Sequence, residues 1–232
     1  RQNIEIFRPR PSPPSPPKDR VLYFPYMNDG AYLLAAATRS IGVPSEVLPK
    51  QTDEDIALGR KYTSSKECFP MICVTGSFVK KLQEPGADPS KMSFFMPDHN
   101  GPCRFGQYNH FHRILFDRLG FKNAEIITPS NDTSYEDVAG EHGQKFRINA
   151  WKGFIVADFL RKIYRETRPY EINKGDSDKL YEKSIKRLEI CIEKGSKGLH
   201  KILTEIVEEF LAIPADKSVR RPVVAIIGEI YM

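Results

Sequence analysis

The chain has 232 residues, of which 35 are lysine or arginine and 30 are aspartate or glutamate, so its formal net charge is +5 at pH 7. This length allows one large α/β domain, or one domain and the beginning of another, around a sizeable core. Acidic and basic residues are interspersed through the C-terminal third, which argues against nucleic acid as a partner. Four cysteines are too few for a secreted disulfide framework, and neither a signal peptide nor a long apolar run occurs. We therefore expect a cytoplasmic protein with no membrane partner.

Residues 1–20 are predicted to form a proline-rich linker. Six prolines lie between Arg8 and Lys18, and each one removes a backbone donor and fixes φ. The segment is therefore unsuited to a helix or an interior strand. We expect an extended connection that arrives from an upstream part of the protein.

From residue 21 onward, predicted strands alternate with predicted helices. Short apolar runs suited to buried parallel strands occur at residues 21–26, 45–48, 92–96 and 125–128. A helical segment separates each strand from the next. This alternation predicts an α/β fold over residues 21–170, with a Rossmann-like, doubly wound parallel sheet.

The helices between these strands have recognisable starts. Asn28-Asp29-Gly30 supplies a cap and a turn before the first helix, and Thr52 is placed to cap the second. A third helix is expected from about Pro70 to Leu82. A fourth follows the Cys103 loop, because apolar side chains recur there at helical spacing.

After the fourth strand the pattern becomes helical. Three rows of apolar residues at helical spacing each predict a helix that buries that row, and we expect Trp151 to lie in the core rather than to serve as a stacking platform. We assign residues 171–220 to a helical extension or bridge of the α/β domain. The three rows are Trp151, Ile155, Phe159 and Ile163; Tyr181, Ile185, Leu188 and Ile192; and Leu199, Ile202, Ile206 and Phe210.

Residues 221–232 read as a buried strand that leads into a turn at Gly228. A parallel strand needs a crossover connection and neighbours to pack on. We therefore expect the chain to be a fragment of a longer protein, with this strand as the first one of a truncated second domain.

Two cysteine-bearing loops carry most of the functional information. Cys68 lies in Lys66-Glu67-Cys68-Phe69-Pro70 and Cys103 lies in 101–108, each at an expected strand-to-helix junction. Ligands of open parallel sheets bind beyond the carboxyl ends of the strands, where both loops should lie. Thiolates at such positions bind soft metal centres, iron-sulfur clusters included, but the chain has no Cys-x-x-Cys pair. Spacing alone therefore leaves reduced structural cysteines as an open alternative.

Other binding motifs do not occur. The sequence has no Gly-x-Gly-x-x-Gly fingerprint and no phosphate-cradling loop that ends in Gly-Lys-Ser or Gly-Lys-Thr. It also lacks a nucleophile-elbow serine. Neither a nucleotide-binding domain nor a serine hydrolase is therefore indicated.

Four motifs in order resemble one family. They are Pro25-Tyr26-Met27-Asn28-Asp29-Gly30-Ala31-Tyr32, Lys66-Glu67-Cys68-Phe69-Pro70, Gly101-Pro102-Cys103-Arg104-Phe105-Gly106-Gln107-Tyr108 and Arg168-Pro169-Tyr170-Glu171. Together they are similar to the 2-hydroxyacyl-CoA dehydratase and benzoyl-CoA reductase subunits, in the branch of large CoA-substrate-specific enzyme activase proteins. The resemblance extends over nearly all of residues 21–232.

The resemblance implies a cofactor, partners and ligands. It implies a 4Fe-4S or double-cubane iron-sulfur cluster held between two α/β domains, with Cys68 and Cys103 as metal ligands. It also implies an ATP-dependent activator that delivers low-potential electrons for reductive or radical chemistry on an acyl-CoA or similar small substrate, as in anaerobic metabolism. The two sulfurs would then lie on the order of 6 to 7 Å apart.

The chain departs from this pattern at Cys73. Met71 takes the second position of an expected Cys-x-x-Cys arrangement, and Cys73 falls two residues later, so it is a possible third ligand or a buried residue. Cys191 flanks an apolar row and reads as a small buried residue. Arg104 either stabilises a cluster or pairs with a carboxylate. His99 either orders its loop or contacts the site.

The two thiolates of Cys68 and Cys103 cannot by themselves complete a 4Fe-4S site. We therefore expect this fragment to be inactive and without a cluster, although the longer protein is expected to belong to an ATP-coupled iron-sulfur dehydratase or reductase system. The alternative is a non-catalytic α/β interaction domain or small-molecule-binding domain in which the cysteines are structural.

Overall fold

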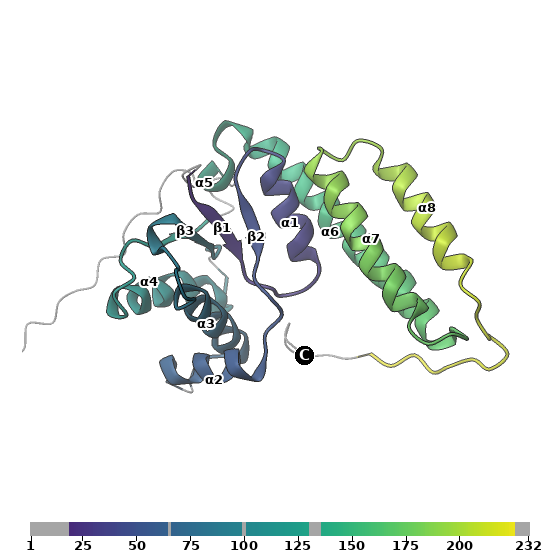
Figure 1. The fold of residues 1–232 in the computed structure, drawn as a ribbon, viewed down its shortest axis with the longest axis horizontal. Helices are drawn as coiled ribbons and strands as arrows, with labels where there is room; N and C mark the ends of the chain where they lie inside the picture. Colours follow the sequence, from purple (N-terminus) through teal and green to yellow (C-terminus); the bar gives the residue numbers. More distant parts are fainter. Residues whose placement is uncertain (1–18, 65, 99–100, 130–135, 226–232) are drawn as a thin grey trace, which may run out of the picture. The chain divides into compact units, whose positions relative to one another are not determined.

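A computed structural model describes residues 19–64, 66–98, 101–129 and 136–225 (Figure 1). Strands and helices alternate through the first half, and longer helices follow. The strands are β1 (Val21–Phe24), β2 (Ser45–Val47), β3 (Met92–Phe95) and β4 (Glu125–Ile127). The α-helices are α1 (Gly30–Arg39), α2 (Asp53–Tyr62), α3 (Phe69–Leu82), α4 (Tyr108–Arg118), α5 (Glu136–Ala139), α6 (Gly143–Thr167), α7 (Asp176–Glu193) and α8 (Leu199–Leu211). Short 3-10 helices are η1 (Pro89–Lys91), η2 (Arg104–Gln107), η3 (Gly140–His142) and η4 (Arg168–Tyr170).

The strands form one parallel sheet in the order β2-β1-β3-β4. Val21 pairs with Met92, and Ser93 pairs with Glu125. Every residue of β3 is buried, as expected of a strand in the middle of a parallel sheet. The predicted Rossmann-like α/β sheet is confirmed. Because the chain goes from β1 to one side and then to the other, the order reverses between β1 and β3, which is where such sheets bind ligands.

The chain divides into two compact units. One consists of Arg1–Pro25 and Leu48–Gly143, and the other of Tyr26–Val47 and Gln144–Met232. The division differs from the boundary we predicted at residue 170, since α1, β2 and α6 group with α7 and α8.

Aromatic side chains fill the core of the first unit. The Phe78 ring lies 4.7 Å from that of Phe94 and 5.0 Å from the imidazole of His112, measured between centroids. Helices α2 and α3 approach each other closely through glycines. A Cβ added to Gly76 would lie 1.8 Å from the backbone oxygen of Asp55. Glycine is therefore required at this crossing.

Polar side chains tie the elements of the second unit together. The Asp29 carboxylate, just before α1, accepts hydrogen bonds from the hydroxyl groups of Tyr26 at 2.8 Å and Tyr181 at 2.7 Å. Burial and these bonds to Asp29 raise the pKa of both tyrosines. The buried amide of Asn149 on α6 donates to the backbone oxygen of Ile192 on α7 at 2.8 Å. The second unit thus has its own polar framework.

The predicted burial of α6 is wrong. Trp151 and Ile155 are each 63% exposed, and Phe159 is also exposed. The helix instead buries a second row that includes the small residues Ala150, Gly153 and Ala157, and a Cβ added to Gly153 would lie 3.0 Å from the Leu33 side chain. Small residues let α1 approach closely, so this row faces the core. Its members are Phe146, Asn149, Ala150, Gly153, Val156, Ala157 and Leu160.

In the other two rows, Tyr181, Leu199 and Ile202 are half-buried and the remaining predicted residues are buried. Ile185, Leu188 and Ile192 are buried on α7, and Ile206 and Phe210 are buried on α8. Residues 221–225 are exposed and form no strand, and the rest of the strand predicted at 221–232 lies outside the described residues. The linker predicted at 1–20 also lies almost entirely outside them. Within the described ranges, no helix is both long enough and apolar enough to cross a membrane.

Candidate functional site

The two cysteine loops lie at starts of helices. Cys68 is the N-cap residue of α3, and Cys103 is the N-cap residue of η2, which leads directly into α4. In a parallel α/β sheet, helices start at the edge formed by the carboxyl ends of the strands. The chain beyond β3 also follows this edge, since the Asp98 backbone N–H donates to the Pro129 oxygen at 3.0 Å. Both loops therefore belong to the edge where ligands bind.

Two side-chain contacts connect these loops. The Arg104 guanidinium donates from Nη1 to the backbone oxygen of Lys66 at 2.7 Å. The Cys68 thiol shares a hydrogen bond with the hydroxyl group of Tyr108, the first residue of α4. The structure therefore brings the Cys68 loop and the Cys103 loop together, as predicted. The separation of the two sulfurs stays a prediction.

The four thiols divide into two classes. Cys103 is exposed and Cys68 is half-buried, whereas Cys73 and Cys191 are buried. Burial raises the pKa of Cys73 and of Cys191, which keeps each of them a neutral thiol. The role of Cys191 as a small buried residue is confirmed. Cys73 is buried on α3, and its role as a third ligand stays a prediction.

Arg104 has a role that sequence analysis missed. We expected its partner to be a cluster or a carboxylate, but it binds the backbone oxygen of Lys66. The Arg104 side chain, which belongs to the Cys103 loop, therefore holds the backbone of the Cys68 loop in place. The guanidinium has five N–H donors, so this bond leaves others for a ligand at the same edge.

Tyr108 was also missed as a site residue. Its apolar neighbours at helical spacing predicted only a core position, and its ring is indeed buried, with Phe105 at 5.3 Å between centroids. A buried tyrosine hydroxyl usually finds a polar partner, and here that partner is Cys68. The Tyr108 hydroxyl group is therefore the sequence feature that could have indicated a role in the site.

The Cys68 loop is further ordered by Glu67. Its carboxylate accepts hydrogen bonds from the backbone N–H groups of Ser64 at 2.8 Å and Lys66 at 3.1 Å. Although the slight burial of Glu67 raises its pKa, these hydrogen bonds lower it overall. The Glu67 carboxylate therefore ties Ser64 and Lys66 to the residue that precedes Cys68.

The accessible residues fit part of a cluster site. Within the described residues, no three histidine, cysteine, aspartate or glutamate side chains lie close enough together to hold a metal ion. Cys68 and Cys103 offer two thiolates, whereas a 4Fe-4S cluster takes four, or three and an exogenous group. His99, the other candidate in this loop, lies outside the described residues.

Comparison with known proteins identifies no relative of this chain. No family model matches the chain, and no significant match is found to a curated protein or to a solved structure. The four motifs and the geometry of the two loops therefore carry the functional information.

Proposed function

We propose that the chain is the α/β domain of an iron-sulfur redox protein of the 2-hydroxyacyl-CoA dehydratase type. Cys68 and Cys103 would supply two thiolate ligands to the cluster, and the other ligands would come from a second α/β domain. An ATP-dependent activator would supply low-potential electrons, and an acyl-CoA or similar small molecule would be the substrate. The bound cluster would supply one-electron transfer.

The observation that carries this proposal is the contact between the two loops. Arg104 and Tyr108 follow Cys103 closely in sequence, and both reach across to the loop of Cys68. Two thiols that differ by 35 positions in sequence are thereby kept at one edge of the sheet. Such preorganisation is what a ligand site requires.

Each supporting residue has a defined task in this proposal. Arg104 fixes the Cys68 loop, and its charge favours an anionic group beside it. When Cys68 is a thiolate, the Tyr108 hydroxyl donates to it and fixes its direction. The N-terminus of α3 also favours negative charge at Cys68.

The test is the iron and sulfide content of the full-length protein after purification and reconstitution without air. Cys68→Ser and Cys103→Ser should each reduce bound iron sharply. Cys191→Ala is the matched control because this thiol is buried on α7, and it should retain iron. Wild-type iron content in both serine variants would refute the ligand assignment. The alternative, an interaction domain or small-molecule-binding domain with structural cysteines, would then be favoured.

A further inference from the structure

A second surface with functional character lies on α6, in the unit that does not contain Cys68 and Cys103. The outward side of this helix exposes large apolar residues from Ile148 to Phe159. They follow one another at spacings of three or four residues and so form a continuous stripe. We call this the α6 stripe; it consists of Ile148, Trp151, Ile155 and Phe159.

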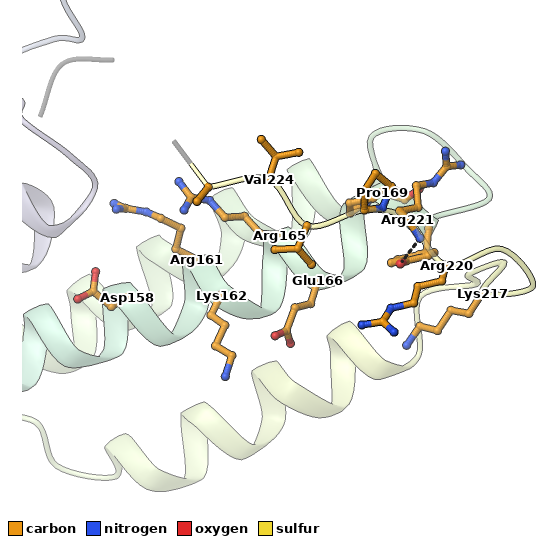
Figure 2. Close-up of a pocket in the computed structure, with 14 residues that line it drawn as sticks. Asp158, Arg161, Lys162, Arg165, Glu166, Pro169, Lys217, Arg220, Arg221 and Val224 are labelled. Atoms are coloured by element: carbon orange, nitrogen blue, oxygen red, sulfur yellow. Dashed lines mark hydrogen bonds between the residues drawn. The ribbon is translucent and has the colours of Figure 1, made fainter. Parts of the chain in front are cut away.

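From Asp158 onward, where the α6 stripe ends, α6 lines a groove rich in positive charge (Figure 2). The groove has a volume of about 1220 Å³ and runs between the second half of α6 and residues 217–225. Its charged lining consists of the cations Arg161, Lys162, Arg165, Lys217, Arg220 and Arg221 and the carboxylates Asp158 and Glu166. We call this the basic groove.

The wall of the basic groove is held in place. The backbone N–H of Arg221 donates to the Tyr170 hydroxyl at 3.0 Å, and its guanidinium donates from Nε to the Pro169 oxygen at 3.1 Å (Figure 2). The Asp216 N–H binds the Tyr170 backbone oxygen at 2.8 Å. The groove is therefore preformed.

Most of its charge is available to a partner. Lys162, Arg165, Lys217 and Arg220 form no ion pair with any other residue that the structure describes. The six cations of the lining outnumber its two carboxylates, so the cations that converge there repel one another, and an incoming anion relieves this repulsion. The groove thus favours a negatively charged partner.

We propose that the α6 stripe and the basic groove form one docking surface for an acidic protein segment that carries apolar side chains along one face. Exposed tryptophan and arginine are typical of the residues that dominate binding energy at protein interfaces. The stripe supplies the apolar contact, and Lys162 and Arg165 supply the charge contact at its end.

Other occupants fit this surface less well. A second hollow, lined by Lys145, Ile148 and Lys152, adds cations at the opposite end of the stripe. Two copies docked through this face would therefore place cations opposite cations. A flat membrane surface does not follow the concave basic groove. Single-stranded nucleic acid stacks its bases on aromatic side chains, which would leave the exposed aliphatic side chains of Ile148 and Ile155 without an apolar partner.

The test uses a fluorescein-labelled synthetic helical peptide of about 21 residues, a length that matches the stripe and the groove together. Leucines occupy one face of the peptide and glutamates fill the rest. The control peptides replace every leucine by serine or every glutamate by glutamine. We expect the first peptide to bind the full chain in fluorescence anisotropy, both controls to bind more weakly, and added salt to weaken binding.

Protein variants locate the binding. Lys162→Glu with Arg165→Glu, and Trp151→Ala separately, should each weaken binding by about tenfold or more, and all three side chains are exposed, so folding is preserved. The matched controls are Lys186→Glu with Lys201→Glu, which makes the same charge change on α7 and α8, and Ile190→Ala. These should bind as the wild type does.

Three results would overturn the proposal. The first is a peptide that does not bind, or that binds every variant equally. The second is displacement of the peptide by oligothymidylate or by anionic phospholipid vesicles that bind more tightly, which would assign the surface to nucleic acid or to a membrane. The third is a dimer in sedimentation that Trp151→Ala abolishes, which would assign the surface to a second copy of the chain.

Discussion

The imidazole of His112 on α4 makes stability depend on pH in a defined way. The ring is fully buried among Phe78, Phe116 and other aromatic side chains, and it shares a hydrogen bond of 3.1 Å with the Thr75 hydroxyl. Burial lowers the pKa of His112 from 6.5 to about 3. The folded protein therefore keeps a neutral ring at pH values where the unfolded chain binds a proton.

The sign and the size of the effect follow from this difference. The stabilising contribution of the neutral ring is complete above pH 6.5 and is lost as the pH falls from 6.5 toward about 3. Each pH unit in this window costs about 1.4 kcal/mol, so about 2.7 kcal/mol should be lost by about pH 4.5. Carboxylates add their own pH dependence, which cancels when wild type and variant are compared.

The assay is equilibrium unfolding in urea at about pH 7 and about pH 4.5. His112→Gln removes the titrating ring and should therefore lose less stability between the two conditions than the wild type does. Thr75→Ala is the matched control, because it removes the hydrogen bond but retains the ring, and it should keep the wild-type pH dependence. Equal pH dependence of the wild type and His112→Gln would refute the reasoning.

Two further predictions concern the first unit. Gly76→Ala should lower the free energy of unfolding in urea by about 1–3 kcal/mol, because the added Cβ would collide with the Asp55 backbone oxygen. The control, Ser77→Ala, removes one hydrogen bond and should lower it by about 1 kcal/mol. A Gly76→Ala variant as stable as the wild type would contradict the close crossing of α2 and α3. Dibromobimane, which fluoresces after bridging two neighbouring thiols, should label the native wild type and Cys191→Ala but neither Cys68→Ser nor Cys103→Ser. If the fluorescent product formed only after unfolding, the thiols of Cys68 and Cys103 would not be neighbours in the native protein.

The elements of the sheet could be predicted from local sequence. All four strands start at the predicted residues and end one or two residues earlier than predicted. Short apolar runs between turn residues define such strands, because a parallel strand is buried on both faces. Thr52 likewise caps α2 as predicted, and its backbone N–H donates to the Asp55 carboxylate at 2.8 Å.

The orientation of α6 could not be predicted, because both of its faces are apolar. The exposed row contains Trp151 and Ile155, which are more hydrophobic than Ala150 and Gly153 in the buried row. Periodicity selects the row with the larger side chains, whereas close packing against α1 selects the row with the smaller ones. That choice depends on tertiary contacts, which no single-helix pattern contains.

The contacts of the candidate site were inaccessible to sequence analysis for a related reason. The motif around Cys103 indicated Arg104 as a site residue, but it did not indicate that Arg104 and Tyr108 both reach toward the loop of Cys68. These contacts exist only because α3 and α4 start at the same edge of the sheet.

The position of each cysteine along its helix separates the candidate ligands from the structural thiols. Cys68 and Cys103 precede their helices, where backbone N–H groups interact favourably with negative charge, and neither residue is fully buried. Cys73 and Cys191 lie within α3 and α7, where burial disfavours the thiolate. A metal ligand has to be a thiolate. Cys68 and Cys103 are therefore the pair that lies outside the packed core, and any further ligand for the proposed cluster has to reach the same two loops.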